Sequence, residues 1–247
     1  MKKLMFTLLL VFLFSQISFS EEKKFVIGVE NLDYLPYQTV VNNDYQGFAR
    51  ELLDLFAQNK GYKFTYRPTP VKRLFIEFLN GEIDFKYPDN PNWKGDLRKG
   101  INISYSNSIV NFIDGVMVLP ERKEMKIDGL KTLGTVLGFT PWDYLDLINS
   151  KSISLQENPN IFGLLQMVIL KRIDGAYVNI AVANYQLETN LKSTQSLTFA
   201  SNLPHTKGNY FVSSIKHPEI LKEINQFLEE KKEEINNLKK KYKLQDK

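Results

Sequence analysis

Ile83-Asp84-Phe85-Lys86-Tyr87 and Ile173-Asp174-Gly175-Ala176-Tyr177 are two copies of one short pattern, Ile-Asp-x-x-Tyr. Each copy follows a segment with helical periodicity and begins a short run typical of a strand. Either copy alone carries little weight, because so short a pattern recurs by chance. The two copies nevertheless occupy equivalent places in two successive sets of expected strands and helices. The pattern therefore predicts a chain with two α/β lobes.

The first set of elements surrounds the Ile83 copy. It opens with a short apolar run bounded by charges, as expected for a buried strand, and its helices carry their apolar residues on one face. The order β-α-β-α-β predicts a parallel sheet with helices on both faces. The expected elements are strands at 25–29, 62–67 and 83–87, a helix that begins at Gly47 and a helix that begins at Pro70.

The second set follows a polar stretch at 88–111 that is rich in proline and glycine. Pro141 is expected in the first turn of a helix with Thr140 as its N-cap, because proline and threonine favour these positions. A long C-terminal helix is expected to begin at Pro218. The other expected elements are strands at 115–119, 131–136, 152–155, 175–178, 197–200 and 209–213, and helices at 161–169 and 180–187.

Tyr87 and Tyr177 close the two copies of the pattern. In parallel α/β sheets, ligands bind beyond the carboxyl ends of the strands. We therefore expect one tyrosine from each lobe to face a shared cleft.

The first twenty residues have the pattern of a cleavable signal peptide. Lys2 and Lys3 form a basic start, residues 4–14 are apolar, and Ser18 and Ser20 fit a small-x-small cleavage site. The apolar run is shorter than the roughly 20 residues that span a bilayer. We expect cleavage near Ser20 and export to the periplasm. No lipid anchor is expected, because the chain contains no cysteine.

The composition limits the classes of function. The absence of cysteine excludes thiol catalysis and cysteine-ligated metals, and no cofactor or metal site is predicted. The net charge is only +4, and its basic excess lies largely in the C-terminal tail. A basic end differs from the basic face of a nucleic-acid-binding protein, so no nucleic-acid partner is expected. The motifs of serine hydrolases and zinc proteases are absent, and we predict that the protein is not an enzyme.

Six short motifs, in order, resemble the type 2 periplasmic solute-binding proteins of extracellular family 3, the polar amino-acid-binding-like group. The resemblance covers nearly all of the chain after residue 20. Each motif is weak alone, and their order carries the resemblance. They are Tyr34-Leu-Pro-Tyr37, Gly47-Phe48 with Glu51-Leu52, Gly81-Glu-Ile-Asp84, Tyr105-Ser106, Arg172-Ile-Asp174 and Lys241-Tyr242.

The resemblance implies a two-lobed fold of the periplasmic-binding-protein-like II type. Two mixed, mostly parallel sheets flanked by helices are joined by a hinge that closes on a ligand. The crossing segments are expected near 109–114 and 204–210. Lobe 1 is then discontinuous, with residues 24–111 plus 206–247, and lobe 2 comprises residues 112–205.

The resemblance also indicates candidate ligand-binding residues. Tyr34 matches the family aromatic that packs over the ligand, although a loop tyrosine covering the core is the alternative. Lys86, Tyr87 and Asp89 follow the lobe 1 strand that supplies ligand contacts in the family. The complete predicted set is Glu30, Tyr34, Arg73, Lys86, Tyr87, Asp89, Trp93, Thr140, Trp142, Tyr177 and Asn179.

Several of these residues have an equally plain structural interpretation. Arg73 suits a bidentate grip on a carboxylate, but it also suits an exposed helix face. Thr140 begins a predicted helix whose amino end favours an anion, or it is only an N-cap. Trp93 and Trp142 are expected either to stack on the ligand or to pack in the core.

Asn179 is the main departure from the family pattern. It occupies the position where amino-acid-binding members carry an aspartate that holds the ligand's ammonium, and an asparagine lacks that charge. The arginine that binds the ligand carboxylate is also displaced, so Arg73, Arg98 or neither fills this role. These differences leave the ligand open.

The resemblance implies a protein, monomeric by default, that captures a small polar solute, an amino acid or a related carboxylate or amine. Delivery to the membrane permease of an ABC-type transporter is one expected role. The alternative is a ligand-sensing partner of a membrane receptor, because both roles use the same closure. An exported enzyme is the third and least supported reading.

Overall fold

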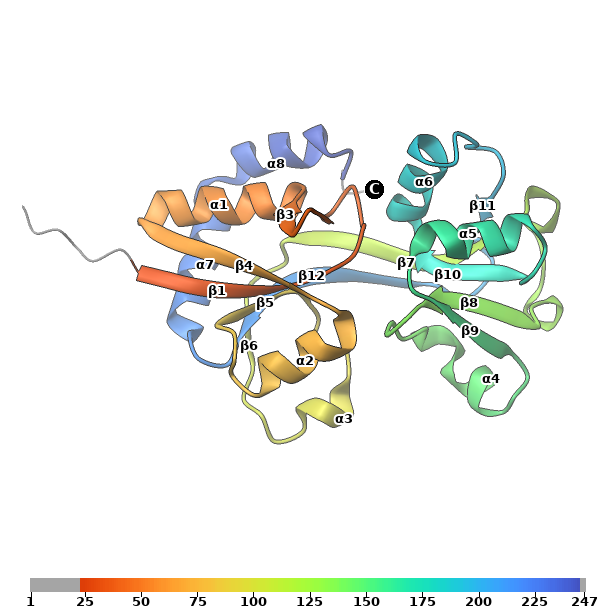
Figure 1. The fold of residues 1–247 in the computed structure, drawn as a ribbon, viewed down its shortest axis with the longest axis horizontal. Coiled ribbons are helices and arrows are strands. Elements are labelled where there is room, and N and C mark those ends of the chain that lie inside the picture. Colours follow the sequence, from red (N-terminus) through yellow and green to blue (C-terminus); the bar gives the residue numbers. More distant parts are fainter. Residues whose placement is uncertain (1–22, 245–247) are drawn as a thin grey trace, which may run out of the picture.

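The computed structural model describes residues 23–244 as two lobes lying side by side. The expected signal peptide at 1–20 and its cleavage site lie outside the described residues. Two long strands, β7 (Val110–Val118) and β12 (Thr206–Ser214), run between the lobes (Figure 1). No helix within residues 23–244 is long and apolar enough to cross a membrane.

The first lobe is built on the strand order β4-β1-β5-β12. The pairs of β1 with β4 and with β5 are parallel, and β12 is antiparallel to β5. Helix α1 packs on β4 and α2 packs on β1 and β5, and Figure 1 shows α1 and α2 on opposite sides of the sheet. The elements are β1 (Lys23–Glu30), β2 (Thr39–Val41), β3 (Asp44–Gln46), α1 (Phe48–Lys60), β4 (Tyr62–Thr69), α2 (Val71–Leu79), β5 (Phe85–Asp89), α3 (Gly95–Arg98), β6 (Ser104–Tyr105), α7 (Pro218–Glu230) and α8 (Lys232–Lys241).

The second lobe has the strand order β7-β10-β8-β9. Strands β10, β8 and β9 are parallel neighbours, and β7 is antiparallel to β10. The parallel core of each lobe therefore ends on an antiparallel strand that continues into the other lobe. The elements are η1 (Pro120–Arg122), η2 (Ile127–Gly129), β8 (Thr132–Val136), η3 (Trp142–Tyr144), α4 (Leu145–Asn149), β9 (Ser154–Asn158), α5 (Ile161–Ile169), β10 (Gly175–Asn179), α6 (Ile180–Thr189) and β11 (Thr198–Phe199).

The two copies of Ile-Asp-x-x-Tyr hold equivalent places in the two lobes. A Cβ added to Gly28 on β1 would lie 2.3 Å from Ile83, and one added to Gly134 on β8 would lie 2.5 Å from Ile173. Each isoleucine thus fills the space above a glycine of the neighbouring strand. Leu74 of α2 and Leu164 of α5 lie over the same two glycines, at 2.6 and 2.5 Å from the added Cβ, so the sheet and its covering helix approach closely in both lobes.

The two aspartates of the pattern also have one structural role. The Asp84 carboxylate accepts a hydrogen bond from the Val26 backbone N–H at 2.8 Å. The Asp174 carboxylate accepts bonds from the backbone N–H groups of Lys131 and Thr132 at 2.9 and 2.8 Å. In each lobe the aspartate therefore secures the start of the adjacent parallel strand. This equivalence confirms the two-lobed architecture predicted from the pattern.

The crossing strands pair with each other where they leave the lobes. The pairing runs from Val110 opposite Tyr210 to Asp114 opposite Thr206. The Phe112 and Tyr210 rings stack with centroids 4.5 Å apart. A Cβ at Gly208 would lie 2.6 Å from the Phe112 ring, so the ring stack requires glycine at this position.

Some expected elements differ from the observed ones. Strand β5 begins and ends two residues later than predicted, at Phe85–Asp89, and the C-terminal helix divides at Lys231 into α7 and α8. Thr140 is not an N-cap as predicted. The first helical turn is the three-residue η3, which Pro141 precedes, and no side chain caps it.

Candidate interlobe site

A small cavity of about 50 Å³ lies between the lobes. Lobe 1 contributes residues from the end of β1, from α2 and from the loop after β5, and lobe 2 contributes the loop before η3 and the end of β10. The crossing strands contribute Asp114 and Tyr210. The lining is Glu30, Tyr34, Val71, Phe75, Pro88, Trp93, Lys94, Asp114, Gly138, Phe139, Thr140, Trp142, Tyr177, Val178, Asn179 and Tyr210.

The structure brings most of the predicted site residues to this cavity. Both tryptophans of the chain line it, Trp93 from lobe 1 and Trp142 from lobe 2. Five further predicted residues also line it, and they come from both lobes: Glu30, Tyr34, Thr140, Tyr177 and Asn179. The predicted residues that the cavity lining does not include are Arg73, Lys86, Tyr87 and Asp89.

Tyr87 lies in the lobe 1 core because β5 continues two residues beyond it, so its ring is buried among core residues. Arg73 lies on the outer face of α2. Its side chain is 73% exposed, and its Nε donates to Glu77 at 2.7 Å. This position corrects the expectation that Arg73 and Tyr87 face the cleft.

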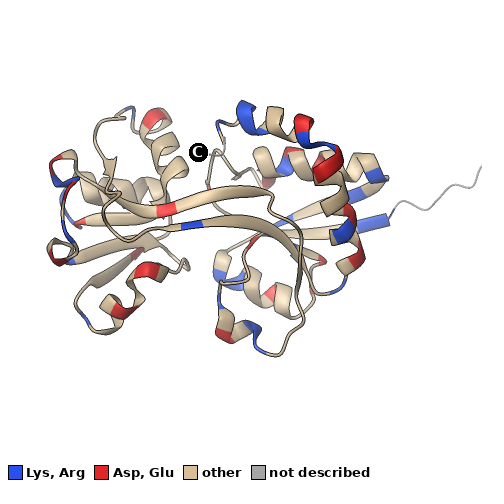
Figure 2. Cartoon of the chain, turned by 180° about the vertical axis from the view of Figure 1, so that it is seen from behind, with Lys and Arg blue, Asp and Glu red and all other residues tan. Residues whose placement is uncertain are grey.

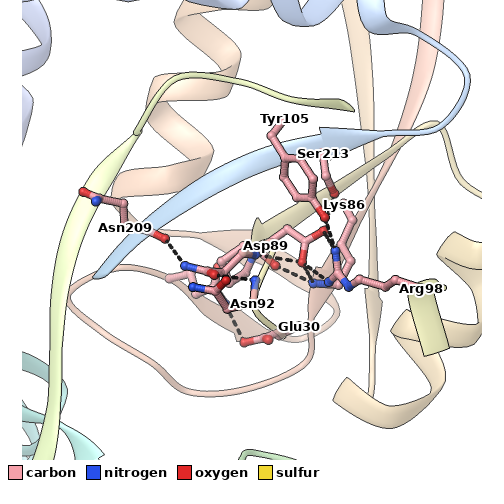
Figure 3. A network of polar contacts seen from close by, with 11 residues as sticks. Glu30, Lys86, Asp89, Asn92, Arg98, Tyr105, Asn209 and Ser213 are labelled. Atoms are coloured by element: carbon pink, nitrogen blue, oxygen red, sulfur yellow. Dashed lines mark hydrogen bonds and ion pairs between the residues drawn. The ribbon is translucent and has the colours of Figure 1, made fainter. Parts of the chain in front are cut away.

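Asp89 is the centre of a buried ion cluster in lobe 1. Arg98 binds both of its carboxylate oxygens, at 2.5 and 3.1 Å, and Lys86 Nζ lies 3.1 Å from Oδ1. Figure 3 shows Lys86 and Arg98 both directed at Asp89. Burial opposes ionisation of Asp89, but the two cations outweigh it and hold its pKa below the usual range. The cluster sets two cations against one carboxylate, so it carries one positive charge in excess, and Arg98 Nε is buried without a hydrogen-bond partner among the described residues.

Two carboxyl groups that line the cavity, unlike that of Asp89, have raised pKa values. Burial raises the pKa of Glu30 from 4.5 to about 7, although Lys86 partly opposes the shift. Burial, together with the nearby acids Asp143 and Glu30, raises the pKa of Asp114 from 3.8 to about 7. Among the residues that the structure describes, Asp114 Oδ1 is buried and accepts no hydrogen bond. The cavity thus holds an acidic group without a cationic partner.

Aromatic rings form much of the cavity wall. Tyr34 of lobe 1 meets Phe139 of lobe 2 edge to face, with centroids 5.8 Å apart. Trp93 packs against Tyr210 of the crossing strand at 5.9 Å. Rings from both lobes and from the crossing strand β12 therefore surround the same space.

Polar contacts join the lobes around the cavity. Lys94 Nζ donates to Thr140 Oγ at 3.2 Å directly at the lining. Two further contacts lie outside it: Gln186 Nε2 donates to Asp33 at 3.0 Å, and Lys72 Nζ lies 3.9 Å from Glu157. The described arrangement is therefore a closed one, with the lobes in contact over the cavity.

Asn179 lines the cavity and also caps a helix. Its side-chain oxygen accepts the Val182 backbone N–H at 3.1 Å at the start of α6, and its amide nitrogen donates to the Tyr210 hydroxyl at 3.3 Å. Its oxygen and nitrogen are thus already engaged within the protein.

The family model of bacterial extracellular solute-binding proteins, family 3, matches residues 25–245. The chain belongs to this family. The resemblance predicted from the short motifs is therefore confirmed, and so is the two-lobed fold class. None of the curated proteins matches the sequence.

Solved structures share the fold of this family 3 protein at low sequence identity. The arginine-, lysine-, histidine-binding protein ArtJ from Geobacillus stearothermophilus has a TM-score of 0.72 at 16% identity, over 89% of this chain and 95% of that one. A histidine kinase sensor domain with similarity to periplasmic binding proteins has 0.71 at 16%, over 90% and 96%. The ancestral amino acid-binding protein AncCDT-1, a precursor of cyclohexadienyl dehydratase, has 0.69 at 19%, over 89% and 95%.

Sequence reasoning missed three residues with polar side-chain groups in the family 3 protein's cavity. Asp114 and Tyr210 lie in segments that were expected only to cross between lobes, and Lys94 lies in an irregular loop. The available signal was a single charged residue inside a crossing strand that is otherwise uncharged. Asp114 is the one charged residue of β7, and Figure 2 shows how little charge the two crossing strands carry.

Proposed function

We propose that the protein is a periplasmic binding protein that captures a small polar solute between its lobes by hinge closure. The observation that carries the proposal is the composition of the cavity lining. Residues from both lobes and from both crossing strands line the cavity. A ligand in the cavity would therefore contact both lobes and hold them together. A cavity of about 50 Å³ that is closed by lobe contacts requires the lobes to open before a solute enters.

The proposed hinge divides the chain into residues 24–111 with 206–247 and residues 112–205. The paired portions of β7 and β12 lie where these lobes meet. A bend in two paired strands changes the relation of the lobes while each parallel core stays intact. This division supports closure without unfolding of either lobe.

Delivery of the solute to the permease of an ABC-type transporter is the proposed role of the closed form. The likeness to a histidine kinase sensor domain favours signalling to a membrane receptor as the second candidate. Genes for a permease and an ATPase beside this gene would support transport, whereas a neighbouring sensor kinase gene would support sensing.

A binding role without catalysis is proposed for the cavity. Neither histidine of the chain lines it. His205 Nδ1 lies 3.1 Å from the Leu203 carbonyl oxygen, and His217 lies beside Glu219 and Asp84. The raised pKa values of Glu30 and Asp114 would also suit proton transfer. A chemical assay should therefore recover any bound solute unchanged, and conversion of the solute would contradict a role in binding alone.

The test is a thermal unfolding screen of the protein purified from the periplasm of expressing cells. Its mass should correspond to an N-terminus at Glu21. We expect at least one compound among amino acids, organic acids and amines to raise the melting temperature. A ligand at 100 times its Kd adds about 2.7 kcal/mol to the free energy of unfolding, which such a screen detects. No shift with any compound would contradict solute binding.

A further inference from the structure

The charged side chains that line the cavity indicate which kind of solute it binds. This inference rests on the proposed solute-binding function. Glu30 and Asp114 place two carboxyl groups in the lining, and Asp143 lies close enough to affect Asp114. Among the described lining residues, Lys94 is the one basic side chain, and none is an arginine. The site is therefore richer in acidic than in basic groups.

The basic residues of lobe 1 nearest to the cavity are already engaged within the lobe, although their two positive charges exceed the one charge of Asp89 and Lys86 also acts on Glu30. Arg98 and Lys86 both bind Asp89 inside the lobe. Lys86 Nζ lies 4.2 Å from the ring centroid of Phe75, which lines the cavity, but Lys86 itself does not line it. Neither cation is free to bind the carboxylate of a ligand, since removal of Asp89's partners would leave a buried charge unpaired.

The other groups that could bind an anion are poorly placed to do so in this cavity. Lys94 is partly exposed and is engaged with Thr140 across the lobes. The helix expected after Thr140 is the 3-10 turn η3, which leads directly into the five-residue α4, so its dipole is that of a short helix. Lys207, the one basic residue of the crossing strands, lines a separate groove with Ile113 and Gly208. A ligand carboxylate would thus enter a space with little to balance its charge.

The same cavity is well suited to a positive charge. Asp114 Oδ1 is buried without a hydrogen-bond donor among the described residues, and Glu30 accepts one bond, from Gln38 at 3.4 Å. The rings of Tyr34, Trp93 and Trp142 line the space beside them. Aromatic faces attract organic cations, and buried carboxylates bind ammonium and guanidinium groups through charge-assisted hydrogen bonds.

We propose that the cavity binds an organic ammonium or guanidinium cation that carries no carboxylate group. Asp114 supplies the principal counter-charge from the hinge, Glu30 supplies a second from lobe 1, and the aromatic rings enclose the cation. Asn179 then needs no charge of its own.

Matched pairs of compounds that differ by one carboxylate test the proposal. The pairs are agmatine and arginine, cadaverine and lysine, phenethylamine and phenylalanine, and tetramethylammonium and glycine betaine. Their Kd values for the full exported protein are measured by calorimetry. We expect at least one cation without a carboxylate to bind at least tenfold more tightly than its partner.

Two variants locate the counter-charge. Asp114→Asn keeps the shape of the side chain and should weaken binding of that cation at least tenfold. Asp128→Asn removes an exposed carboxylate elsewhere on the surface and should leave the Kd unchanged. Melting temperatures without ligand show that both variants fold.

The outcomes separate this inference from the proposed function. If the carboxylate-bearing member binds more tightly in every pair that binds at all, solute binding stands and the cation proposal is wrong. If Asp114→Asn binds the cation as tightly as the unmodified protein, the assignment of the counter-charge is wrong. If no member of any pair binds and the wider screen is also negative, both proposals fail.

Discussion

Asp89 holds Arg98 with both carboxylate oxygens, at 2.5 and 3.1 Å, and the pair is buried inside lobe 1. Sequence reasoning considered Arg98 as a possible grip for a ligand carboxylate. The structure instead gives its guanidinium a carboxylate from the same chain. The pair therefore has a structural role that can be measured separately from binding.

Arg98→Ala should lower the free energy of unfolding by about 3 kcal/mol, the lower part of the range for a broken buried ion pair. Lys86 and Ser213 continue to stabilise Asp89, which limits the loss. Urea unfolding measures the change. Arg73→Ala is the comparison and should cost less, because the Arg73 guanidinium is largely exposed and Arg67 and Thr69 remain beside the buried Glu77 carboxylate. Equal losses in the two variants would contradict a special role for the buried pair.

Cation affinity should depend on pH through Glu30 and Asp114. Both carboxyls have their pKa raised to about 7, and a cation binds their ionised forms. Affinity should therefore rise with pH, by about tenfold for one such group between pH 6 and pH 8. Tyr34, Tyr37, Tyr177 and Tyr210 face the same region, and they stay neutral here because their pKa values are raised too.

Calorimetry at pH 6, 7 and 8 with the tightest-binding cation without a carboxylate tests this dependence. Asp114→Asn should flatten the profile. An affinity that increases toward pH 6 would show that the ionised carboxylates do not face the ligand.

The ligand-free protein should show the opposite trend in stability. Each raised pKa means that the folded protein binds more protons than the unfolded chain between the ordinary pKa and about 7. The contribution of these groups to the free energy of unfolding thus falls as pH rises from about 4 to 7. Urea unfolding gives the free energy of unfolding of Asp114→Asn and of the unmodified protein at each pH. The difference between the two values isolates the contribution of Asp114. The variant should gain relative stability at pH 8, and a gain at pH 5 instead would refute the assignment.

Gly208→Ala should lower the free energy of unfolding by disturbing the paired crossing strands β7 and β12. The added Cβ would lie 2.6 Å from the Phe112 ring, which stacks on Tyr210 of the cavity wall. Overpacking of this kind typically costs about 1–3 kcal/mol. Gly95→Ala is the control, because nothing lies within 4 Å of the added Cβ and alanine favours a helix. A Gly208 variant as stable as the Gly95 variant would show that the ring stack is not tight.

Much of the fold could be predicted because local patterns determine it. Apolar periodicity located the helices, and the repeated Ile-Asp-x-x-Tyr identified two lobes through residues that pack on Gly28 and Gly134. Trp93 and Trp142 were expected either to stack on a ligand or to pack in the core, and both line the cavity. Tyr87 was expected to face the cleft but lies in the core, because β5 extends two residues beyond it.

The charge state of the site could not be predicted in the same way. It depends on contacts between residues that are distant in sequence, such as Ser213 with Asp89 or Asn179 with Tyr210. Asp114 gains its importance only when β7 and β12 pair and bring it between the lobes. A sequence identifies such a carboxylate as a single charge in an otherwise uncharged strand but does not show that it lacks a partner.

Tryptophan fluorescence tests the central claim, that a solute binds between the lobes, most directly. Trp93 and Trp142 are the two tryptophans of the chain, and they line the cavity from opposite lobes. A solute that raises the melting temperature should change the emission of the protein with the same Kd. Trp93→Phe and Trp142→Phe should each retain part of that change. Saturable stabilisation with unchanged emission from both tryptophans would place the solute outside the interlobe cavity and contradict the account.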